Sequence, residues 1–211
     1  MTFLSYGTHI LGPRAATHQL ELYLDLICPF SAKQLQGVYD YVLPLIKDGK
    51  LDLAVIIRQI PQPWHSSSTL VHEAAIAVAQ VLASTKHDDF NDRQVNEQFN
   101  KFFKQLMDDQ KEFYDEPCSK ESPEQTRQRL ADKASDFVDR NSFLEKVKTG
   151  KSNGGTAVTA DLKQAIKYGR QNGVHVTPTV ALNGLIDPSV SSSFTKDDWT
   201  KFFEDKGLLK N

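Results

Sequence analysis

The 211-residue sequence contains only two cysteines, Cys28 and Cys118, and they lie far apart along the chain. A secreted scaffold held by disulfides uses more cysteines, so the sequence predicts a protein of the reducing cytoplasm. The chain also has no Asn-x-Ser/Thr acceptor, which disfavours a glycosylated protein. No acidic residue precedes Glu21, but Arg14 is the one basic residue there, so organelle targeting stays open as an alternative.

Long apolar runs are also missing, since none approaches the ~18 residues that span a bilayer. The N-terminal segment lacks the basic start and apolar core of a secretory signal, and we expect it to form a short arm. The chain carries 25 basic and 27 acidic residues, a formal net charge of -2. No global positive field therefore favours nucleic acid or an anionic membrane, and the predicted partners are proteins or small molecules.

The first part of the chain, residues 19–60, is predicted to fold as a strand, a helix and a second strand. The segment QLELYLDLI, residues 19–27, alternates leucines with other apolar residues and predicts a strand covered on both faces. Residues 31–49 carry apolar side chains at helical spacing, with a kink expected at Pro44. The apolar, β-branched segment 51–60 predicts a second strand, and the order implies a parallel, right-handed βαβ unit.

Residues 61–168 contain no convincing strand pattern and instead show four helical periods, which predicts a helical insertion. These periods are TLVHEAAIAVAQVLAS, VNEQFNKFFKQLMDD, PEQTRQRLADKASDFV and TADLKQAIKYGRQNG. Strand character returns over residues 175–182, and Asn183-Gly184 predicts a two-residue hairpin to a short partner strand. A last helix is predicted to open at Thr195, with Trp199, Phe202 and Phe203 as its buried face.

Cys28 lies where the first strand gives way to the first helix. Backbone N–H groups without partners and the positive end of the helix dipole both favour a thiolate at this position. Pro29 suits the first helical turn, and the Ser31 hydroxyl is placed to donate toward the sulfur. The alternative is that Cys28 is an inert, small apolar residue at the end of a strand.

Pro178 interrupts an otherwise regular strand pattern, Val176-Thr177-Pro178-Thr179-Val180. Proline inside a strand marks an edge, a bulge or a cis bond. A cis Thr177-Pro178 bond would leave the preceding backbone groups free to pair with an extended ligand. An ordinary edge-strand proline is the alternative.

The pieces LELYLDLICPFSAKQLQ and GVHVTPTVALNG, in this order and separation, resemble the DsbA-like thioredoxin family. The resemblance implies an α/β thioredoxin-like fold (βαβ–ββα) with a large helical insertion. Its domains would be residues 18–62 and 170–211 for the thioredoxin-like part and 63–169 for the insertion. Cys28 then matches the nucleophilic cysteine, and the loop Thr177-Pro178 is the one facing it. Ser31 occupies the position of the family's resolving cysteine, so the chain is a monothiol variant.

Kappa-class glutathione transferases are also similar to this chain, with Ser-Pro-Tyr-Ser in place of Cys28-Pro29-Phe30-Ser31. The leading functional prediction is a DsbA-like thiol–disulfide oxidoreductase that acts through Cys28 alone. Without a second motif cysteine, the mixed disulfide must be resolved by another thiol, so glutathione is the predicted co-substrate, with no tightly bound cofactor. A kappa-like glutathione transferase or isomerase and a redox-inactive binding protein remain as alternatives.

Further residues are assigned to substrate contacts. The predicted catalytic pair is Cys28 and Ser31, and the predicted substrate-binding residues are Pro29, Phe30, Trp64, His65, Val176, Thr177 and Pro178. Trp64 and His65 follow the second strand, at the sheet edge where open α/β sheets bind ligands, and His65 could assist proton transfer. A proline-rich turn anchored by the tryptophan is the alternative. The predicted partners are protein or small-molecule disulfides and glutathione, with a homodimer as a further candidate.

Two further groups of residues are candidate sites by their spacing and charge. His65 and His72 are seven residues apart, about 10 Å along a helix, which is too far for one zinc ion, so no metal site is predicted. Cys118 has acidic neighbours that are expected to raise its pKa, which makes it a poor nucleophile. It could still resolve Cys28 if their Cα atoms came within about 7 Å.

Overall fold

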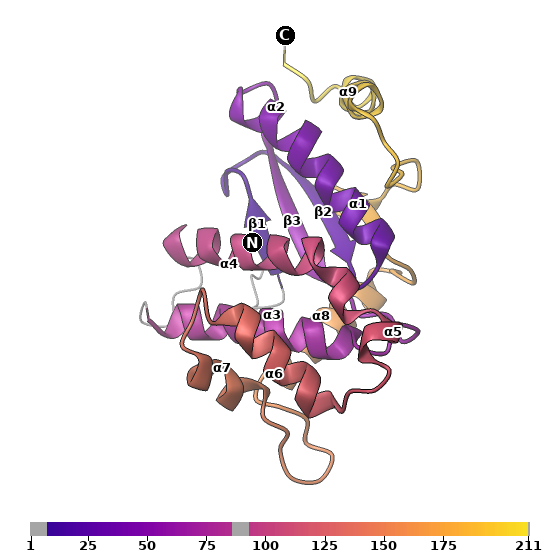
Figure 1. The fold of residues 1–211 in the computed structure, drawn as a ribbon. Helices are drawn as coiled ribbons and strands as arrows, with labels where there is room; N and C mark the ends of the chain where they lie inside the picture. The colour runs from indigo at the N-terminus through magenta and orange to yellow at the C-terminus, as the bar shows by residue number, and fades with distance from the viewer. Residues whose placement is uncertain (1–7, 86–92, 211) are drawn as a thin grey trace.

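A computed structural model of the chain describes residues 8–85 and 93–210. Its centre is a five-stranded mixed sheet, drawn in the upper half of Figure 1, with the strand order β1-β3-β2-β4-β5. The strands are β1 (Thr8–Leu11), β2 (His18–Leu24), β3 (Leu53–Gln59), β4 (Thr179–Leu182) and β5 (Leu185–Ile186). The predicted parallel pairing of the two central strands is confirmed, because β2 and β3 run parallel from the pair His18 and Leu53 onward.

The predicted crossover helix is divided into three pieces. Helix α1 (Pro29–Gly37) passes into a π-helical turn, η1 (Val38–Val42), and then into α2 (Leu43–Lys47). The break therefore falls in the turn before Pro44, not at the proline itself. Proline has no N–H to donate to the preceding turn, so the backbone ahead of it is the part that departs from α geometry.

The expectation of a short N-terminal arm is wrong for residues 8–11. These residues form β1, which pairs antiparallel with β3 at the edge of the sheet. The side chain of His9 is buried against the rings of Phe99 and Phe103, with centroid distances of 4.9 and 4.3 Å. The strand was missed because its burial depends on α4 (Arg93–Asp108), which is distant in sequence.

Burial of His9 makes acid stability a test of this packing. Desolvation lowers the pKa of His9 from 6.5 to about 3, so the folded protein keeps this imidazole neutral. The unfolded chain binds a proton below pH 6.5 and the folded chain does not, so stability falls as the pH drops from 6.5 toward 3. The expected contribution is about 2 kcal/mol at pH 5, measured by urea unfolding.

The matched variants are His9→Leu and, at an exposed position, His175→Leu. His9→Leu should flatten the decline in unfolding free energy between about pH 7 and 5, whereas His175→Leu should leave the decline as it is. Equal slopes in the two variants would show that His9 is solvated in the folded protein.

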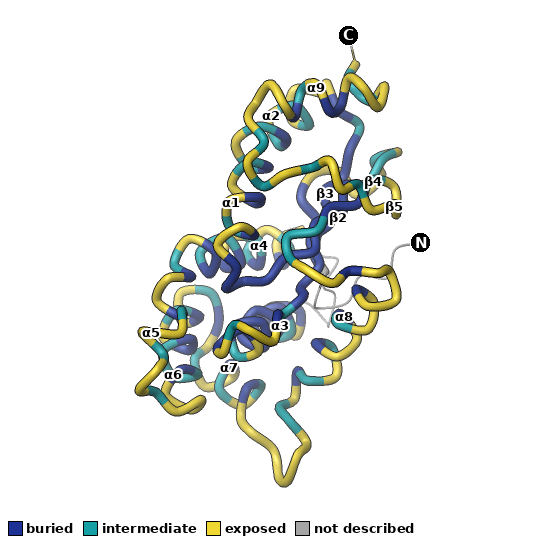
Figure 2. Tube along the Cα trace, turned by 90° about the vertical axis from the view of Figure 1, so that its right-hand side faces the viewer, coloured by how far each residue is buried: buried dark blue, intermediate teal, exposed yellow. Residues whose placement is uncertain are grey.

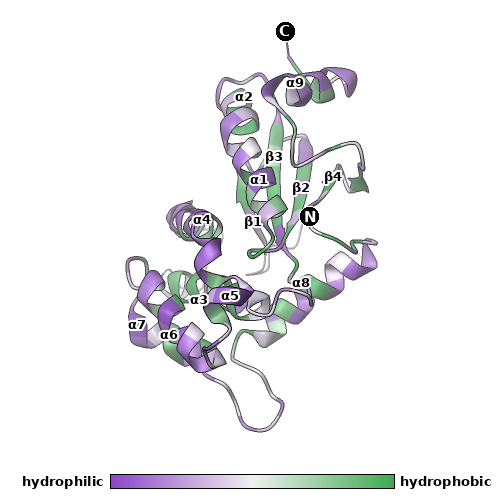
Figure 3. Ribbon diagram, turned by 45° about the vertical axis from the view of Figure 1, so that its right-hand side comes forward, coloured by the Kyte–Doolittle hydropathy of each residue, from purple (hydrophilic) through white to green (hydrophobic). Residues whose placement is uncertain are grey.

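Helices between β3 and β4 form the lower half of Figure 1. They are α3 (Ser68–Ser84), α4 (Arg93–Asp108), the 3-10 turn η2 (Gln110–Phe113), α5 (Asp115–Cys118), α6 (Pro123–Ala134), α7 (Arg140–Val147) and α8 (Thr159–Gln171). The four predicted periods became α3, α4, α6 and α8; η2, α5 and α7 were missed. The buried path in Figure 2 runs through the central strands into α3, which is also largely apolar in Figure 3. Most residues of α3 are buried, so it is the core of the insertion.

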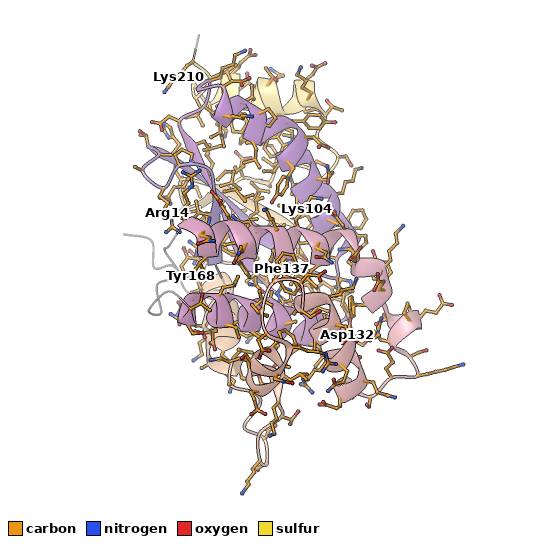
Figure 4. The ribbon with its side chains drawn as sticks, turned by 60° about the vertical axis from the view of Figure 1, so that its left-hand side comes forward. Arg14, Lys104, Asp132, Phe137, Tyr168 and Lys210 are labelled. Carbon is orange, nitrogen blue, oxygen red and sulfur yellow. The ribbon has the colours of Figure 1, made fainter. Side chains whose placement is uncertain are left out.

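The predicted domain boundary at residues 169 and 170 falls inside α8. This helix packs on α3 and also on the sheet, where Gly169 approaches the side chain of Ile60. On the same side, the guanidinium of Arg58 lies 4.0 Å from the centre of the Tyr168 ring, labelled in Figure 4. Arg58 also forms a buried ion pair with Glu21. These contacts join the insertion to the sheet without a break at the predicted boundary.

The C-terminal part follows the predicted order with a shorter strand. The expected strand over residues 175–182 is only β4, because residues 175–178 form an irregular loop in which the Thr177–Pro178 bond is cis. Asn183 and Gly184 both have positive φ angles and join β4 to β5 as predicted. Helix α9 (Lys196–Asp205) begins with a capping box at Thr195 and buries Trp199, Phe202 and Phe203. No helix in the two described segments combines the length and apolarity that crossing a bilayer requires.

Candidate active site

Cys28 is the N-cap residue of α1, directly beyond the carboxyl end of β2. The site brings together two segments that are distant in sequence, since the Cys28 thiol donates a hydrogen bond to the carbonyl oxygen of Thr177 at 3.4 Å. The cis Thr177–Pro178 bond follows that carbonyl. Cys28 is only 5% exposed, so its sulfur lies just beneath the surface. The two motifs singled out in the sequence thus form one site.

Ser31 is buried in the first turn of α1, but its hydroxyl faces the strand and not the sulfur. Ser31 Oγ accepts a hydrogen bond from the backbone N–H of Asp25 at 3.2 Å. Within the described residues, its hydroxyl makes no hydrogen bond to Cys28 Sγ, contrary to the expectation from the sequence. The reason is local geometry: the end of β2 presents an N–H group to the first turn of the helix.

Asp25 is a fully buried carboxylate three residues before Cys28, and the sequence analysis did not single it out. Its Oδ1 accepts hydrogen bonds from the backbone N–H of Ile27 at 3.0 Å and from Ser68 Oγ at 2.6 Å. Its Oδ2 accepts from the backbone N–H of Gln62 at 3.0 Å and lies 2.7 Å from His65 Nδ1. Through these hydrogen bonds the Asp25 carboxylate connects the Cys28 loop (residues 25–28), the segment after β3 and the start of α3.

The charge of Asp25 is stabilised despite its burial. Burial would raise the pKa of this carboxyl group, but His72, Ser68 and His65 outweigh burial and hold the pKa well below its usual range. Asp25 is therefore ionised at neutral pH and accepts the Nδ1–H of His65. In the neutral imidazole this leaves His65 Nε2 as the proton-accepting nitrogen.

His65 and His72 are closer together than their spacing suggested. Residues seven apart are separated by about 10 Å only along one continuous helix. Helix α3 begins at Ser68, so His65 lies in the preceding loop. Both rings reach Asp25, with His72 Nε2 3.3 Å from Oδ1. His72 Nε2 also lies 3.1 Å from the backbone nitrogen of Leu26, and its Nδ1 lies 3.0 Å from Gln59 Oε1. No cluster of His, Cys, Asp and Glu in the described part of the chain has the arrangement of a metal site.

The helical insertion supports the Cys28 loop from the other side. The Gln110 amide donates to the carbonyl oxygens of Leu26 and Cys28 at 3.1 and 3.3 Å. Tyr114 donates its hydroxyl to Gln110 Oε1 at 2.7 Å. Burial is the main cause that raises the pKa of the Tyr114 hydroxyl, and the nearby Cys28 raises it further, so the hydroxyl stays a hydrogen-bond donor at neutral pH.

Helix α4 also contacts η1, because Lys104, labelled in Figure 4, lies 5.5 Å from the centre of the Tyr39 ring.

Three large apolar side chains are exposed in the segments that form the site. Phe30, Trp64 and Val176 are 62%, 58% and 57% exposed. They come from the first turn of α1, the loop after β3 and the loop before Pro178. Exposed apolar groups around a recessed sulfur are typical of a surface that binds another chain.

Two adjoining cavities flank Pro29. One, of about 510 Å³, is lined by Ile27, Pro29 and His65 on one side and by residues 111 and 114–117 on the other. The second, of about 540 Å³, shares Pro29, Lys111 and Tyr114 and extends to residues 192–195. The sheet domain and the insertion thus border space beside Pro29 that is large enough for a small ligand.

Comparison with known proteins decides the family. The sequence profile described as thioredoxin matches residues 5–205, nearly the whole chain. The chain belongs to the thioredoxin family. No curated protein sequence matches it.

Solved structures agree with the thioredoxin family at the level of the fold. A candidate protein-disulfide isomerase from Pseudomonas syringae is 24% identical, with 92% of this chain and 96% of that chain covered and a TM-score of 0.69. Oxidised BdbD from Bacillus subtilis is 15% identical, with 95% and 92% covered and a TM-score of 0.63. DsbA from Chlamydia trachomatis is 16% identical, with 94% and 89% covered and a TM-score of 0.61. The α/β thioredoxin-like fold with a helical insertion is therefore confirmed.

The second cysteine of this thioredoxin-family chain lies outside the cluster just described. Cys118 ends α5, and its sulfur accepts a hydrogen bond from Arg129 at 3.5 Å. Burial, and then Glu121, raise the pKa of the Cys118 thiol, with Arg129 opposing them. The predicted direction is confirmed, but its main cause is burial and not the acidic neighbours in the sequence. Both cysteines are free thiols.

Proposed function

We propose that the chain is a thiol–disulfide oxidoreductase that works through Cys28 alone and uses glutathione to complete its cycle. The observation that carries this proposal is the position of the Cys28 sulfur at the N-terminus of α1, 3.4 Å from the Thr177 carbonyl. Helix N-termini are common positions of cysteines whose thiolates act as nucleophiles in disulfide exchange.

In the first step the Cys28 thiolate attacks one sulfur of a substrate disulfide. A new bond forms between Cys28 and that sulfur, the old disulfide bond breaks, and the other sulfur leaves as a thiolate that takes up a proton. Ser31 occupies the position from which a second motif cysteine would attack, so the chain cannot resolve this mixed disulfide within the motif. Glutathione attacks instead, releases Cys28 as a thiol and is itself oxidised into a new disulfide. In this proposal the cycle runs in the reducing cytoplasm.

The substrate disulfide is proposed to belong to a protein or peptide. Phe30, Trp64 and Val176 offer apolar contacts to its side chains. The backbone of residues 176 and 177 runs past Cys28, where an extended segment of the substrate can lie beside it. Pro29, Phe30, Trp64, Val176, Thr177 and Pro178 are therefore proposed to bind the substrate, and Cys28 to react with it.

A second candidate function is a binding protein without turnover. It is favoured by the burial of Cys28, which is 5% exposed and whose thiol donates a hydrogen bond to the carbonyl oxygen of Thr177. Such a protein would use the same apolar residues to bind a partner and would leave the sulfur unreactive. The two candidates therefore differ in the reactivity of one atom.

Alkylation with iodoacetamide separates these candidates. We expect Cys28 in the folded protein to react faster than Cys118 near neutral pH, because burial raises the pKa of the Cys118 thiol. Each site is followed by peptide mass as a function of pH. A Cys28 that reacts no faster than Cys118, or reacts only after unfolding, would support the binding protein.

A further inference from the structure

We infer that the cavity between His65 and Lys111 binds the thiol that resolves Cys28, and that His65, held by Asp25, accepts the proton of this thiol. The inference rests on the proposed function, because it concerns the second half of that cycle. The thiol class is a small zwitterion that carries both carboxylate and ammonium groups, with glutathione as the expected member.

The location of the cavity is the first support. Its volume is about 510 Å³, and its walls include Ile27 and Pro29, the residues on either side of Cys28 in the sequence. A small thiol in this space would therefore lie next to the Cys28 mixed disulfide. The apolar residues Phe30 and Val176 lie outside its lining, which leaves them for the first substrate.

The orientation of His65 is the second support. Its Nδ1 lies 2.7 Å from Asp25 Oδ2, and Asp25 is itself fixed by the backbone N–H of Gln62 and Ile27. The ring is largely buried, with 19% of the side chain exposed, and it lines the cavity. With Nδ1–H directed at the carboxylate, Nε2 is the nitrogen that can take a proton from a ligand.

Charged groups in the cavity supply the third support. Lys111 provides a cation, and Asp115 and Glu116 provide anions, on the wall formed by η2 and α5. Lys111 would bind a carboxylate of the thiol, and the two acidic residues would bind its ammonium group. The titratable groups around His65 are therefore Asp25 from the end of β2, His72 from α3, and Lys111, Tyr114, Asp115 and Glu116 from the insertion.

The resolving step balances without any other reactant. The thiol loses its proton to His65 Nε2, and its sulfur attacks the mixed disulfide and forms a bond to the substrate sulfur. The bond to Cys28 breaks, and the proton returns from His65 to the Cys28 sulfur. The incoming sulfur is oxidised and Cys28 is reduced, so the chain ends in its starting state.

The test isolates this step in a Cys118→Ser background. Cys28 is first converted to its mixed disulfide with glutathione by oxidised glutathione, and the return of the free Cys28 thiol on addition of reduced glutathione is then followed by mass after acid quenching, between about pH 6 and 8. His65→Asn is the informative variant, because its amide N–H can still donate to Asp25 but it has no basic nitrogen. His65→Gln is measured beside it, and His175→Asn is the matched control at an exposed histidine.

The expected result is that His65→Asn slows the release of Cys28 about 100-fold at neutral pH, whereas His175→Asn does not. The rate in His65→Asn should rise about tenfold per pH unit, in proportion to the glutathione thiolate, and the rate with His65 present should rise less steeply. Lys111→Gln should raise the half-saturating glutathione concentration several-fold.

Equal rates and equal pH slopes in both His65 variants and the His175 control would overturn the role of His65. A Lys111→Gln variant that saturates like the unmodified chain would overturn the binding site. Failure of Cys28 to form the mixed disulfide at all would be seen in the loading step, and it would overturn the proposed function along with this inference.

Discussion

Cys28→Ser is expected to abolish disulfide exchange, with a loss of at least about 10³-fold in the glutathione-dependent reduction of a peptide disulfide. A hydroxyl is far less acidic than a thiol and cannot form the mixed disulfide, so no partial cycle remains. The substitution is nearly isosteric, and the serine hydroxyl can still donate to the Thr177 carbonyl. We therefore expect the midpoint of thermal unfolding to change little.

Cys118→Ser is the matched control for this prediction. Cys118 lies outside the hydrogen-bonded cluster around Asp25, and burial raises the pKa of its thiol, so the variant is expected to keep its exchange activity. Equal loss in both variants would mean that Cys118 resolves Cys28. Exchange that survives Cys28→Ser would contradict the proposal, and turnover of a model electrophile by that variant would point to a glutathione transferase instead.

Asp25→Asn is expected to lower the free energy of unfolding by about 3 kcal/mol. The amide that replaces the carboxylate can no longer accept at both oxygens, so its N–H₂ group would face one set of donors, either Ile27 N–H and Ser68 or Gln62 N–H and His65. Leaving buried donors without an acceptor costs ~1–3 kcal/mol for each group. Urea unfolding of the variant and the unmodified chain at neutral pH measures the difference.

The stabilisation by the Asp25 carboxylate is expected to depend on pH. The pKa of Asp25 is lower in the folded chain than its ordinary value of 3.8, so the stabilisation is complete above pH 3.8 and is lost as the pH falls below it. The difference between Asp25→Asn and the unmodified chain should therefore shrink in acid. Asp132→Asn, which removes an exposed ion pair with Arg140, is the control and should cost less than ~1 kcal/mol. Equal effects of the two substitutions would mean that the carboxylate of Asp25 is not buried and bonded as described.

Periodicity predicted the parts of the fold in which neighbouring residues decide the outcome. Strands β2 and β3, the hairpin at Asn183-Gly184 and the capped start of α9 all depend on short-range patterns. The strand β1 was missed because its few residues acquire strand structure only by pairing with β3. Likewise, α7 is a short helix whose buried residues face other helices of the insertion, and its own pattern is weak.

The sequence predicted the reactive cysteine and the loop beside it, but not the buried side chains that hold them in place by hydrogen bonds. Two motifs at opposite ends of the chain predicted that Cys28 and Thr177 would come together, and the hydrogen bond between them agrees with this. The carboxylate of Asp25 was overlooked, although an acid between Leu24 and Leu26 in an otherwise apolar segment was a visible signal. Gln110 gave no such signal, because an amide among polar helix residues looks like ordinary surface.

Incubation of the folded chain with oxidised glutathione, followed by peptide mass mapping, tests whether Cys28 is the reactive cysteine. We expect one glutathionyl group on Cys28, formed without denaturant and removed by reduced glutathione with recovery of the free thiol. A modification found only on Cys118, or on Cys28 only after unfolding, would contradict a catalytic role for Cys28.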